Sequence, residues 1–152
     1  MRKSNRGIVI IFLIILGIPL GFFLYGYFTA DTRMYQETWG LIIPSNFKKQ
    51  YSVSEFGGTG DGETYEIYAL KGTDTQEDAL VLKGMSSQKN TEIQEQIITI
   101  LKTLKVDTQR YPDFSHDYQW KVFKKSDRQT KIYILFDKKL SLIYLVQNIW
   151  AS

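Results

Sequence analysis

The chain has 152 residues, no cysteine and one histidine, with 19 basic and 16 acidic residues. The lack of cysteine excludes disulfides, thiolate metal sites and thiol nucleophiles, and a single histidine gives little support to a transition-metal site. Three basic residues precede residue 7, so the rest of the chain carries 16 charges of each sign. The net charge of +3 therefore does not indicate nucleic-acid binding.

Residues 7–28 form an apolar run with no charged residue. At about 1.5 Å per residue, a helix of this length reaches roughly 33 Å, compared with about 30 Å for a hydrocarbon core. Arg2, Lys3 and Arg6 precede the run, and Asp31 is the first charge after it. The positive-inside rule predicts a cytoplasmic tail (1–6), a single transmembrane anchor (7–28) and an extracytoplasmic C-terminal domain at the cell membrane.

A cleaved signal peptide is the alternative interpretation of this run. The run exceeds the usual signal h-region of about 7–15 residues, and cleavage after Ala30 would place Phe28 where a small side chain is needed. We therefore expect an uncleaved anchor. Gly17 and Gly21 match a small-xxx-small dimerisation motif, but Pro19 between them favours a bend instead.

After the anchor we expect a helical stem (29–40) and one α+β domain (41–152). Aromatic and β-branched residues bounded by turn residues predict strands at 51–56, 63–70, 118–124, 131–137 and 140–150, with a short further strand at 80–82. Residues 91–105 have apolar residues at helical spacing, and Thr91 with Gln94 fits a capping box. The order ββ(β)αβββ predicts one antiparallel sheet of about five to six strands with one helix packed across it.

A glycine-rich segment, residues 57–62, separates the first two predicted strands. Its glycine spacing matches a phosphate-binding loop, but Glu63 stands where lysine is required and a strand follows in place of a helix, so we reject nucleotide binding. Asp61 and Glu63, together with Asp74 and Asp78, would offer oxygen ligands to Ca²⁺. Their spacing does not match an EF-hand, and a hairpin turn is the favoured interpretation. We expect no cofactor and no metal.

His116 would serve as a general base only if a carboxylate oriented it, and its neighbour Asp117 is the candidate. Adjacent residues do not naturally face each other, and no serine lies in a nucleophile-elbow pattern. A histidine in a surface loop is the favoured interpretation. The sequence therefore contains no catalytic constellation, and we do not expect an enzyme.

Charge is segregated within the predicted domain. Residues 55–95 carry nine acidic and three basic side chains, whereas residues 121–139 carry seven basic and two acidic ones. The two regions either neutralise each other in the fold or form solvated edges, or else the basic region faces an anionic partner such as lipid head groups or wall polymer.

Aromatic residues offer a second kind of surface, a groove for a glycan or peptide, although aromatics at strand spacing are usually core. The candidates for the groove are Tyr65, Tyr68, Tyr118, Trp120, Tyr133, Tyr144 and Trp150. Tyr68 and Tyr133 alternate with polar residues and are the better surface candidates. Charge and aromatic patterns together give a candidate interaction surface of Asp61, Glu63, Tyr68, Lys121, Lys124, Lys125, Arg128 and Tyr133.

Several short motifs carry a family resemblance: Leu41-Ile42-Ile43-Pro44, Tyr51, Gly60-Asp61-Gly62-Glu63-Thr64-Tyr65, Lys131–Asp137 and Leu142-Ile143-Tyr144. Over residues 41–149 the chain resembles small membrane-tethered or lipoprotein-like proteins of Gram-positive bacteria, which share a GDG-x-x-Y hairpin and a C-terminal strand pair. That group often has a bulky residue or histidine before GDG, where this chain has Thr59. The resemblance implies no function and no site residue.

We expect a non-enzymatic, single-pass membrane protein that contacts the bilayer through residues 7–28. Its small extracytoplasmic domain would bind a protein, a peptide or an anionic envelope component. One alternative is an immunity or envelope-stress accessory protein. The other is a cell-envelope hydrolase that uses Asp61, Glu63 or His116.

Overall fold

The computed structural model describes residues 15–19, 21, 33–44, 46–58, 61–71, 82–125 and 129–150. The chain divides into two compact units, Met1–Ile42 and Ile43–Ser152. In the first unit, residues 15–19, 21 and 33–39 are helical. Gly40 follows with φ 64° and donates its N–H to the Gln36 carbonyl, so it ends the stem helix as predicted. Most of the predicted anchor lies outside the described residues, and none of the helices within them is long and apolar enough to span a membrane.

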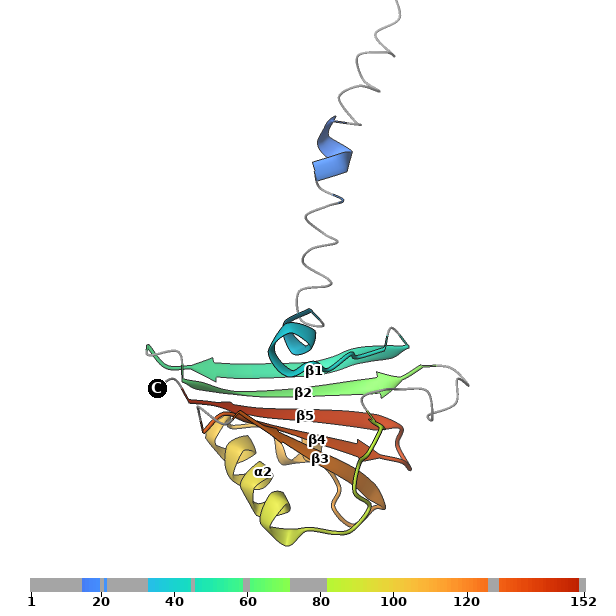
Figure 1. Cartoon of the computed structure of the whole chain (residues 1–152), viewed down its shortest axis with the longest axis vertical. Coiled ribbons are helices and arrows are strands. Elements are labelled where there is room, and N and C mark those ends of the chain that lie inside the picture. Colours follow the sequence, from blue (N-terminus) through green and yellow to red (C-terminus); the bar gives the residue numbers. More distant parts are fainter. Residues whose placement is uncertain are drawn as a thin grey trace, which may run out of the picture. The chain divides into compact units, whose positions relative to one another are not determined.

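The second unit is an α+β fold with one five-stranded antiparallel sheet (Figure 1). The strands are β1 (Phe47–Phe56), β2 (Gly62–Leu70), β3 (Tyr118–Lys124), β4 (Lys131–Asp137) and β5 (Leu142–Ile149), in the spatial order β1-β2-β5-β4-β3. The last strand, β5, thus lies between the β1–β2 hairpin and the β3–β4 hairpin. The predicted meander is confirmed, because β4 lies between β3 and β5.

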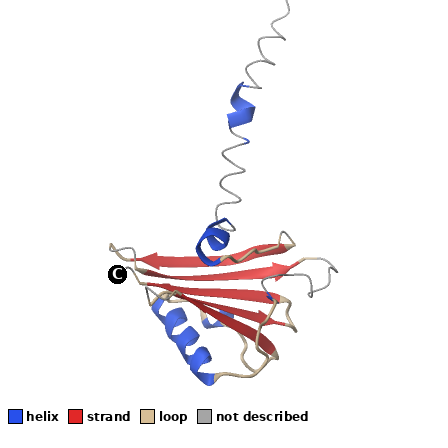
Figure 2. Ribbon diagram, viewed as in Figure 1, coloured by secondary structure: helices blue, strands red, loops and turns tan. Residues whose placement is uncertain are grey.

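The sheet carries helix α2 (Thr91–Thr103) on one face, followed by the short 3-10 helix η3 (Thr108–Arg110) (Figure 2). Ile93, Ile97, Ile100 and Leu101 of α2 are buried, and they form a single core with Tyr65, Tyr133, Tyr144 and Val146 of the sheet. The predicted apolar stripe is therefore the surface that α2 packs onto the sheet.

The predicted capping box of α2 is wrong. Asn90 is the N-cap, and its Oδ1 accepts the N–H of Ile93 at 3.1 Å. Thr91 is already helical, and the side chain of Gln94 donates to the Tyr118 hydroxyl at 2.6 Å instead of bonding back to the cap. Asparagine is as good an N-cap residue as threonine, and here the helix begins one residue earlier than the capping box predicted.

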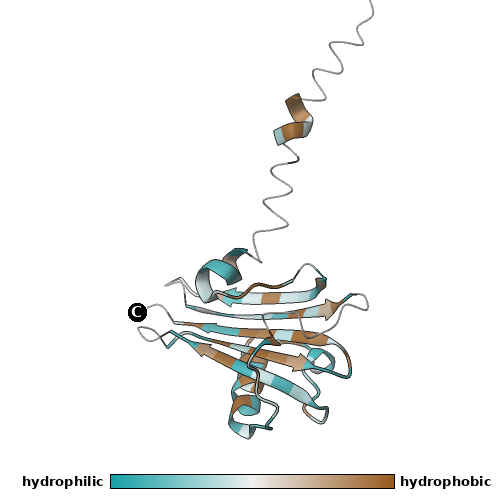
Figure 3. Ribbon diagram, turned by 45° about the vertical axis from the view of Figure 1, so that its right-hand side comes forward, coloured by the Kyte–Doolittle hydropathy of each residue, from teal (hydrophilic) through white to brown (hydrophobic). Residues whose placement is uncertain are grey.

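The opposite face of the sheet is also buried along its central strands. Ile132, Ile134 and Phe136 of β4 and Ile143 and Leu145 of β5 are each no more than 2% exposed. Figure 3 shows apolar residues recurring along these strands. The sheet therefore lies between two apolar surfaces, which explains why β4 is apolar on both faces.

Three strand predictions differ from the structure by two residues or more. The last strand was predicted at 140–150, whereas β5 begins at Leu142 and ends at Ile149. β1 begins at Phe47, four residues earlier than predicted, and its register shifts between Lys49 and Tyr51. The polar run Lys48-Lys49-Gln50 concealed this part of the strand, because polar residues are ordinary on an edge strand with a bulge. In the predicted strand 80–82, residues 80 and 81 lie outside the described residues, and Leu82 is not in a strand.

Candidate functional site

One cross-strand row runs over all five strands, at the end of the sheet where β1 and β3 end and β2 and β4 begin. Strand pairing aligns Glu55 with Glu63, Glu63 with Asn148, Asn148 with Lys131, and Lys131 with Lys124. Side chains alternate along strands, so this row lies on the same face as Tyr65, Tyr133 and Tyr144, the face that carries α2. We call these five residues the turn-end row.

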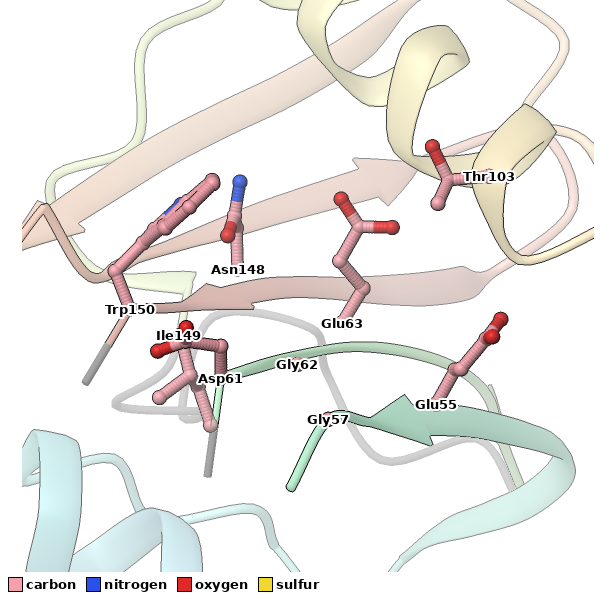
Figure 4. Close-up of a pocket in the computed structure, with 9 residues that line it drawn as sticks. All are labelled: Glu55, Gly57, Asp61, Gly62, Glu63, Thr103, Asn148, Ile149 and Trp150. Atoms are coloured by element: carbon pink, nitrogen blue, oxygen red, sulfur yellow. The ribbon is translucent and has the colours of Figure 1, made fainter. Parts of the chain in front are cut away.

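The acidic half of the turn-end row borders a cleft of about 270 Å³. The cleft is lined by Glu55, Gly57, Asp61, Gly62, Glu63, Thr103, Asn148, Ile149 and Trp150. In Figure 4 the side chains of Glu63, Asn148 and Trp150 point to the side where the helix carrying Thr103 lies, whereas Asp61 and Ile149 point away. The cleft therefore has carboxylates, an amide and one large aromatic side chain on its walls.

Two of the carboxylates that line the cleft, Glu55 and Glu63, have no cation to balance them among the described residues. Within the described part of the chain, neither Glu55 nor Glu63 forms an ion pair, and Glu63 Oε2 is buried without a hydrogen-bond partner. Burial, and secondarily the negative charge of Glu55, raise the pKa of Glu63 above its usual value. A cation in the cleft would offset both the cost of burying the charged Glu63 and its repulsion by Glu55.

The backbone of the β1–β2 hairpin sets the shape of this cleft. Gly57 donates its N–H to the Asp61 carbonyl at 2.7 Å, which closes the loop. A Cβ on Gly62 would come within 2.2 Å of a Phe56 ring carbon and 2.6 Å of the Glu55 carbonyl oxygen. Close packing against Phe56 and Glu55 therefore accounts for glycine at position 62.

The basic half of the row continues over β4 and β3. Lys131 is half-buried and Lys124 is exposed, and within the described residues neither side chain forms an ion pair or hydrogen bond. Lys121, three residues earlier on β3 and on its other face, donates to the Lys83 carbonyl at 3.2 Å and lies over the Phe123 ring. The acidic and basic residues of the turn-end row are therefore on one face of the sheet, but β5 lies between them.

A second cluster lies at the opposite end of the sheet, around His116. Its Nδ1 is 2.8 Å from Oδ2 of Asp137, the last residue of β4, and its Nε2 is 3.1 Å from Asp113 Oδ2 and 3.1 Å from Lys139 Nζ. Hydrogen bonds from the Ser115 side chain and backbone lower the pKa of Asp113 below its usual value. Asp117, the candidate orienting carboxylate that the sequence disfavoured, is not the contact; Asp137, 21 residues away, holds the imidazole.

His116 has the oriented imidazole that a general base needs, but the residues around it hold two loops together and offer it no nucleophile. Ser115 Oγ, the nearest hydroxyl in sequence, donates to Asp113 at 2.6 Å and not to His116. Both ring nitrogens already have partners. Asp137 also accepts the Leu140 N–H at 3.0 Å, so the cluster ties the loop before β3 to the β4–β5 turn.

A third polar cluster is centred on Glu66, on the face of the sheet away from α2. Glu66 Oε1 accepts from Lys49 Nζ at 2.7 Å and from Ser52 Oγ at 3.0 Å, while Oε2 accepts from the Tyr68 hydroxyl at 2.7 Å. The Lys49 ammonium also lies 5.7 Å from the centre of the Tyr68 ring. This buried carboxylate is fully satisfied within the protein.

Several members of the predicted interaction surface are not on the surface. Tyr68 and Tyr133 are each 3% exposed, because their faces of the sheet are covered, and their hydroxyls bond to Glu66 and Gln96. The favoured interpretation of the other aromatics as core is confirmed for Tyr65, Tyr118 and Tyr144, and of the seven candidates for the groove only Trp150 is well exposed. Arg128 lies outside the described residues.

The residues proposed for a hydrolase do not meet in one site. Glu63 aligns with the start of β4, and His116 contacts its end, Asp137, six residues further on. At about 3.3 Å per residue, these points are roughly 20 Å apart. Among the described residues, no group of three or more His, Asp or Glu side chains is arranged to hold a metal ion, and Asp74 and Asp78 lie outside them.

Comparisons with known proteins assign no family to this chain. No family model matches the sequence, and neither a curated protein nor a solved structure matches it significantly. The functional argument therefore depends on the geometry described above.

Proposed function

We propose that this chain is a non-enzymatic, membrane-tethered binding protein whose contact surface is the turn-end row and its cleft. The observation that carries the proposal is the set of unbalanced charges there: Glu55 and Glu63 on one side, Lys131 and Lys124 on the other. Charges without partners inside a protein are available to a partner outside it.

The contrast with the His116 and Glu66 clusters supports this choice. In both of those clusters the carboxylates already accept hydrogen bonds from protein donors. Such clusters stabilise a fold, whereas the turn-end row gains nothing from its charges until a ligand arrives. The apolar, uncharged run at residues 7–28 supports the tether.

Position-specific photo-crosslinking of the full chain in intact bacterial cells tests the contact surface. A photoreactive residue at Glu55 or Trp150 should give discrete crosslinked species, whereas the same residue at Glu95 or Lys138, which are exposed elsewhere, should not. Equal patterns at all four positions would overturn the proposed surface.

Protease access tests the tether separately. In cells whose outer layers have been removed, an added protease should digest residues 43–152 while an N-terminal epitope stays protected, as expected for an inside N-terminus. Protection of both ends would contradict the predicted topology.

A further inference from the structure

We propose that the turn-end row binds a small zwitterion, an ammonium group linked by a short chain to a phosphate. This inference rests on the proposed binding function and names the ligand class for the same site. The ammonium would occupy the cleft beside Glu63, and the phosphate would lie over Asn148 toward Lys131 and Lys124.

The cleft has the chemistry that an ammonium group requires. Glu55 and Glu63 supply negative charge, and neither oxygen of the Glu63 carboxylate has a hydrogen-bond partner among the described residues. Trp150, which is 50% exposed, adds an aromatic face, and indole is the best of the aromatic rings for cations. At about 270 Å³ the cleft suits a small group better than a folded partner.

The basic half of the row has the chemistry that a phosphate requires. Lys131 and Lys124 are direct cross-strand neighbours on β4 and β3, so two ammonium groups can approach one anion. A phosphate monoester carries about 1.5 to 2 negative charges near neutral pH, which matches two lysines better than a single carboxylate would. Lysine binds phosphate as a point charge, so no exact side-chain geometry is needed.

The spacing of the strands sets the separation of the two ligand charges. Glu63 and Lys131 both pair with Asn148 from opposite sides, so their backbones are two strand spacings apart, about 9.6 Å. With both side chains standing perpendicular to the sheet, the charged groups would keep this separation, and one charge-assisted hydrogen bond of about 2.8 Å at each end would leave about 4 Å for the ligand. A two-carbon linker between amine and phosphate, as in phosphoethanolamine, fits that interval, with the Asn148 amide beneath it.

The opposite order of charges on the ligand and the row explains why both halves are needed. An isolated amine would meet the carboxylates but leave Lys131 and Lys124 unneutralised, and an isolated phosphate would meet the lysines but be repelled by Glu63. A zwitterion satisfies both ends at once, and the link between its charges gives it the advantage of a bivalent ligand.

Calorimetric titration of the full chain in a non-ionic detergent at low salt tests this inference. Phosphoethanolamine is the probe, and ethanolamine and inorganic phosphate are its two halves. We expect phosphoethanolamine to bind at least tenfold more tightly than either half. Equal affinity for phosphate alone or for ethanolamine alone would overturn the zwitterion, as would no measurable binding of the probe.

Charge variants test the placement of the ligand. Glu63→Gln and Lys131→Gln should each weaken binding at least tenfold, whereas Glu95→Gln and Lys138→Gln, on exposed positions elsewhere, should change it less than twofold. The double exchange Glu63→Lys with Lys131→Glu should restore binding, because a zwitterion can bind in the reverse direction. Failure of both single variants to weaken binding would place the ligand elsewhere.

A measurement on the unmodified protein guards against variants that do not fold. Amide chemical shifts in the presence of phosphoethanolamine should change most at Glu63, Asn148 and Lys131, and little near His116. Shift changes centred on the His116 end would overturn the proposal without any substitution.

Two further experiments distinguish a lipid source of the ligand from a non-lipid one, and a failure of the zwitterion proposal from a failure of the proposed function. Nanodiscs of phosphatidylethanolamine should compete with the soluble probe if the zwitterion is a lipid head group, and a lack of competition assigns it to a soluble or polymer-borne source. Crosslinks specific to Glu55 and Trp150 combined with no phosphoethanolamine binding would leave the proposed function standing and overturn only the zwitterion.

Discussion

Glu63 and Glu66 lie three residues apart in β2, on opposite faces of the same sheet, and they have opposite surroundings. Glu66 accepts hydrogen bonds from Lys49, Ser52 and Tyr68, whereas Glu63 has a buried oxygen with no partner and a second carboxylate, Glu55, beside it. The first carboxylate therefore stabilises the fold and the second costs stability. A carboxylate that costs stability is the one to examine for binding.

The largest expected effect comes from removing the satisfied charge. Glu66→Gln should lower the free energy of unfolding by about 2–4 kcal/mol, because Lys49 and the Tyr68 hydroxyl lose their charged acceptor in a buried place. Urea unfolding followed by tryptophan fluorescence measures it. Glu63→Gln is the matched control and should change the value by less than about 0.5 kcal/mol at neutral pH. Equal losses for both would remove the distinction between the two carboxylates.

The next effect comes from changing the shape of the cleft and leaving its charge intact. Gly62→Ala should cost about 1–3 kcal/mol, because the added methyl group meets the Phe56 ring and the Glu55 carbonyl. Gly58→Ala, where a Cβ meets nothing within 4 Å, should be nearly neutral in thermal unfolding. A neutral Gly62→Ala would show that the hairpin backbone shifts without cost.

The His116 cluster should behave like Glu66 and not like Glu63, with a smaller loss. His116→Asn should lower the free energy of unfolding by about 1–2 kcal/mol, since buried Asp137 loses one of its donors. Asp117→Asn, which alters the exposed neighbour, should have no measurable effect. A larger loss for Asp117→Asn than for His116→Asn in urea unfolding would contradict the structural role of the His116–Asp137 contact.

The smallest expected effect is the pH dependence of Glu63 itself. Its pKa is raised in the folded state, so the folded protein retains the proton more strongly than the unfolded chain does. The cost of ionising Glu63 is absent below its usual pKa of 4.5 and is fully present above its raised value. The stability of the unmodified protein should therefore fall relative to Glu63→Gln as pH rises through this window, by less than about 1 kcal/mol after solvent screening. A difference that does not change with pH would show that Glu63 has its usual pKa.

The sequence predicted the elements with strong periodic patterns and missed the contacts between distant residues. The bounds of β3 and β4 agree with the prediction. Both strands are rich in aromatic and β-branched residues, and turn residues lie at their ends. The pairing of His116 with Asp137 could not be predicted, since it depends on where a loop meets the far end of a strand. The turn-end row likewise appears only once the position of β5 between the two hairpins is known.

Burial was the other source of error, and it has a simple cause. Alternation with polar residues suggested that Tyr68 and Tyr133 face solvent. The nearest polar residue to Tyr68 on its face of β2, Glu66, is itself buried, and Tyr133 on β4 lies between two buried isoleucines. A polar residue that is hydrogen-bonded inside the protein gives the same sequence pattern as one in water. The hydroxyls of buried tyrosines also have partners inside the protein, as Tyr133 has Gln96, and the sequence gives no sign of these contacts.

The segment before α2 has a consequence for the solution behaviour of this sheet. Ser86 exchanges two backbone hydrogen bonds of 2.8 Å with Trp120, and the Trp120 ring nitrogen donates to the Gln88 carbonyl at 2.6 Å. This segment therefore occupies the backbone N–H and C=O of Trp120, which β3 would otherwise offer to a strand of another molecule. At the other edge, the bulge between Lys49 and Tyr51 interrupts the regular ladder of β1. Both boundaries of the sheet thus resist edge-to-edge aggregation, one by being covered and one by being irregular.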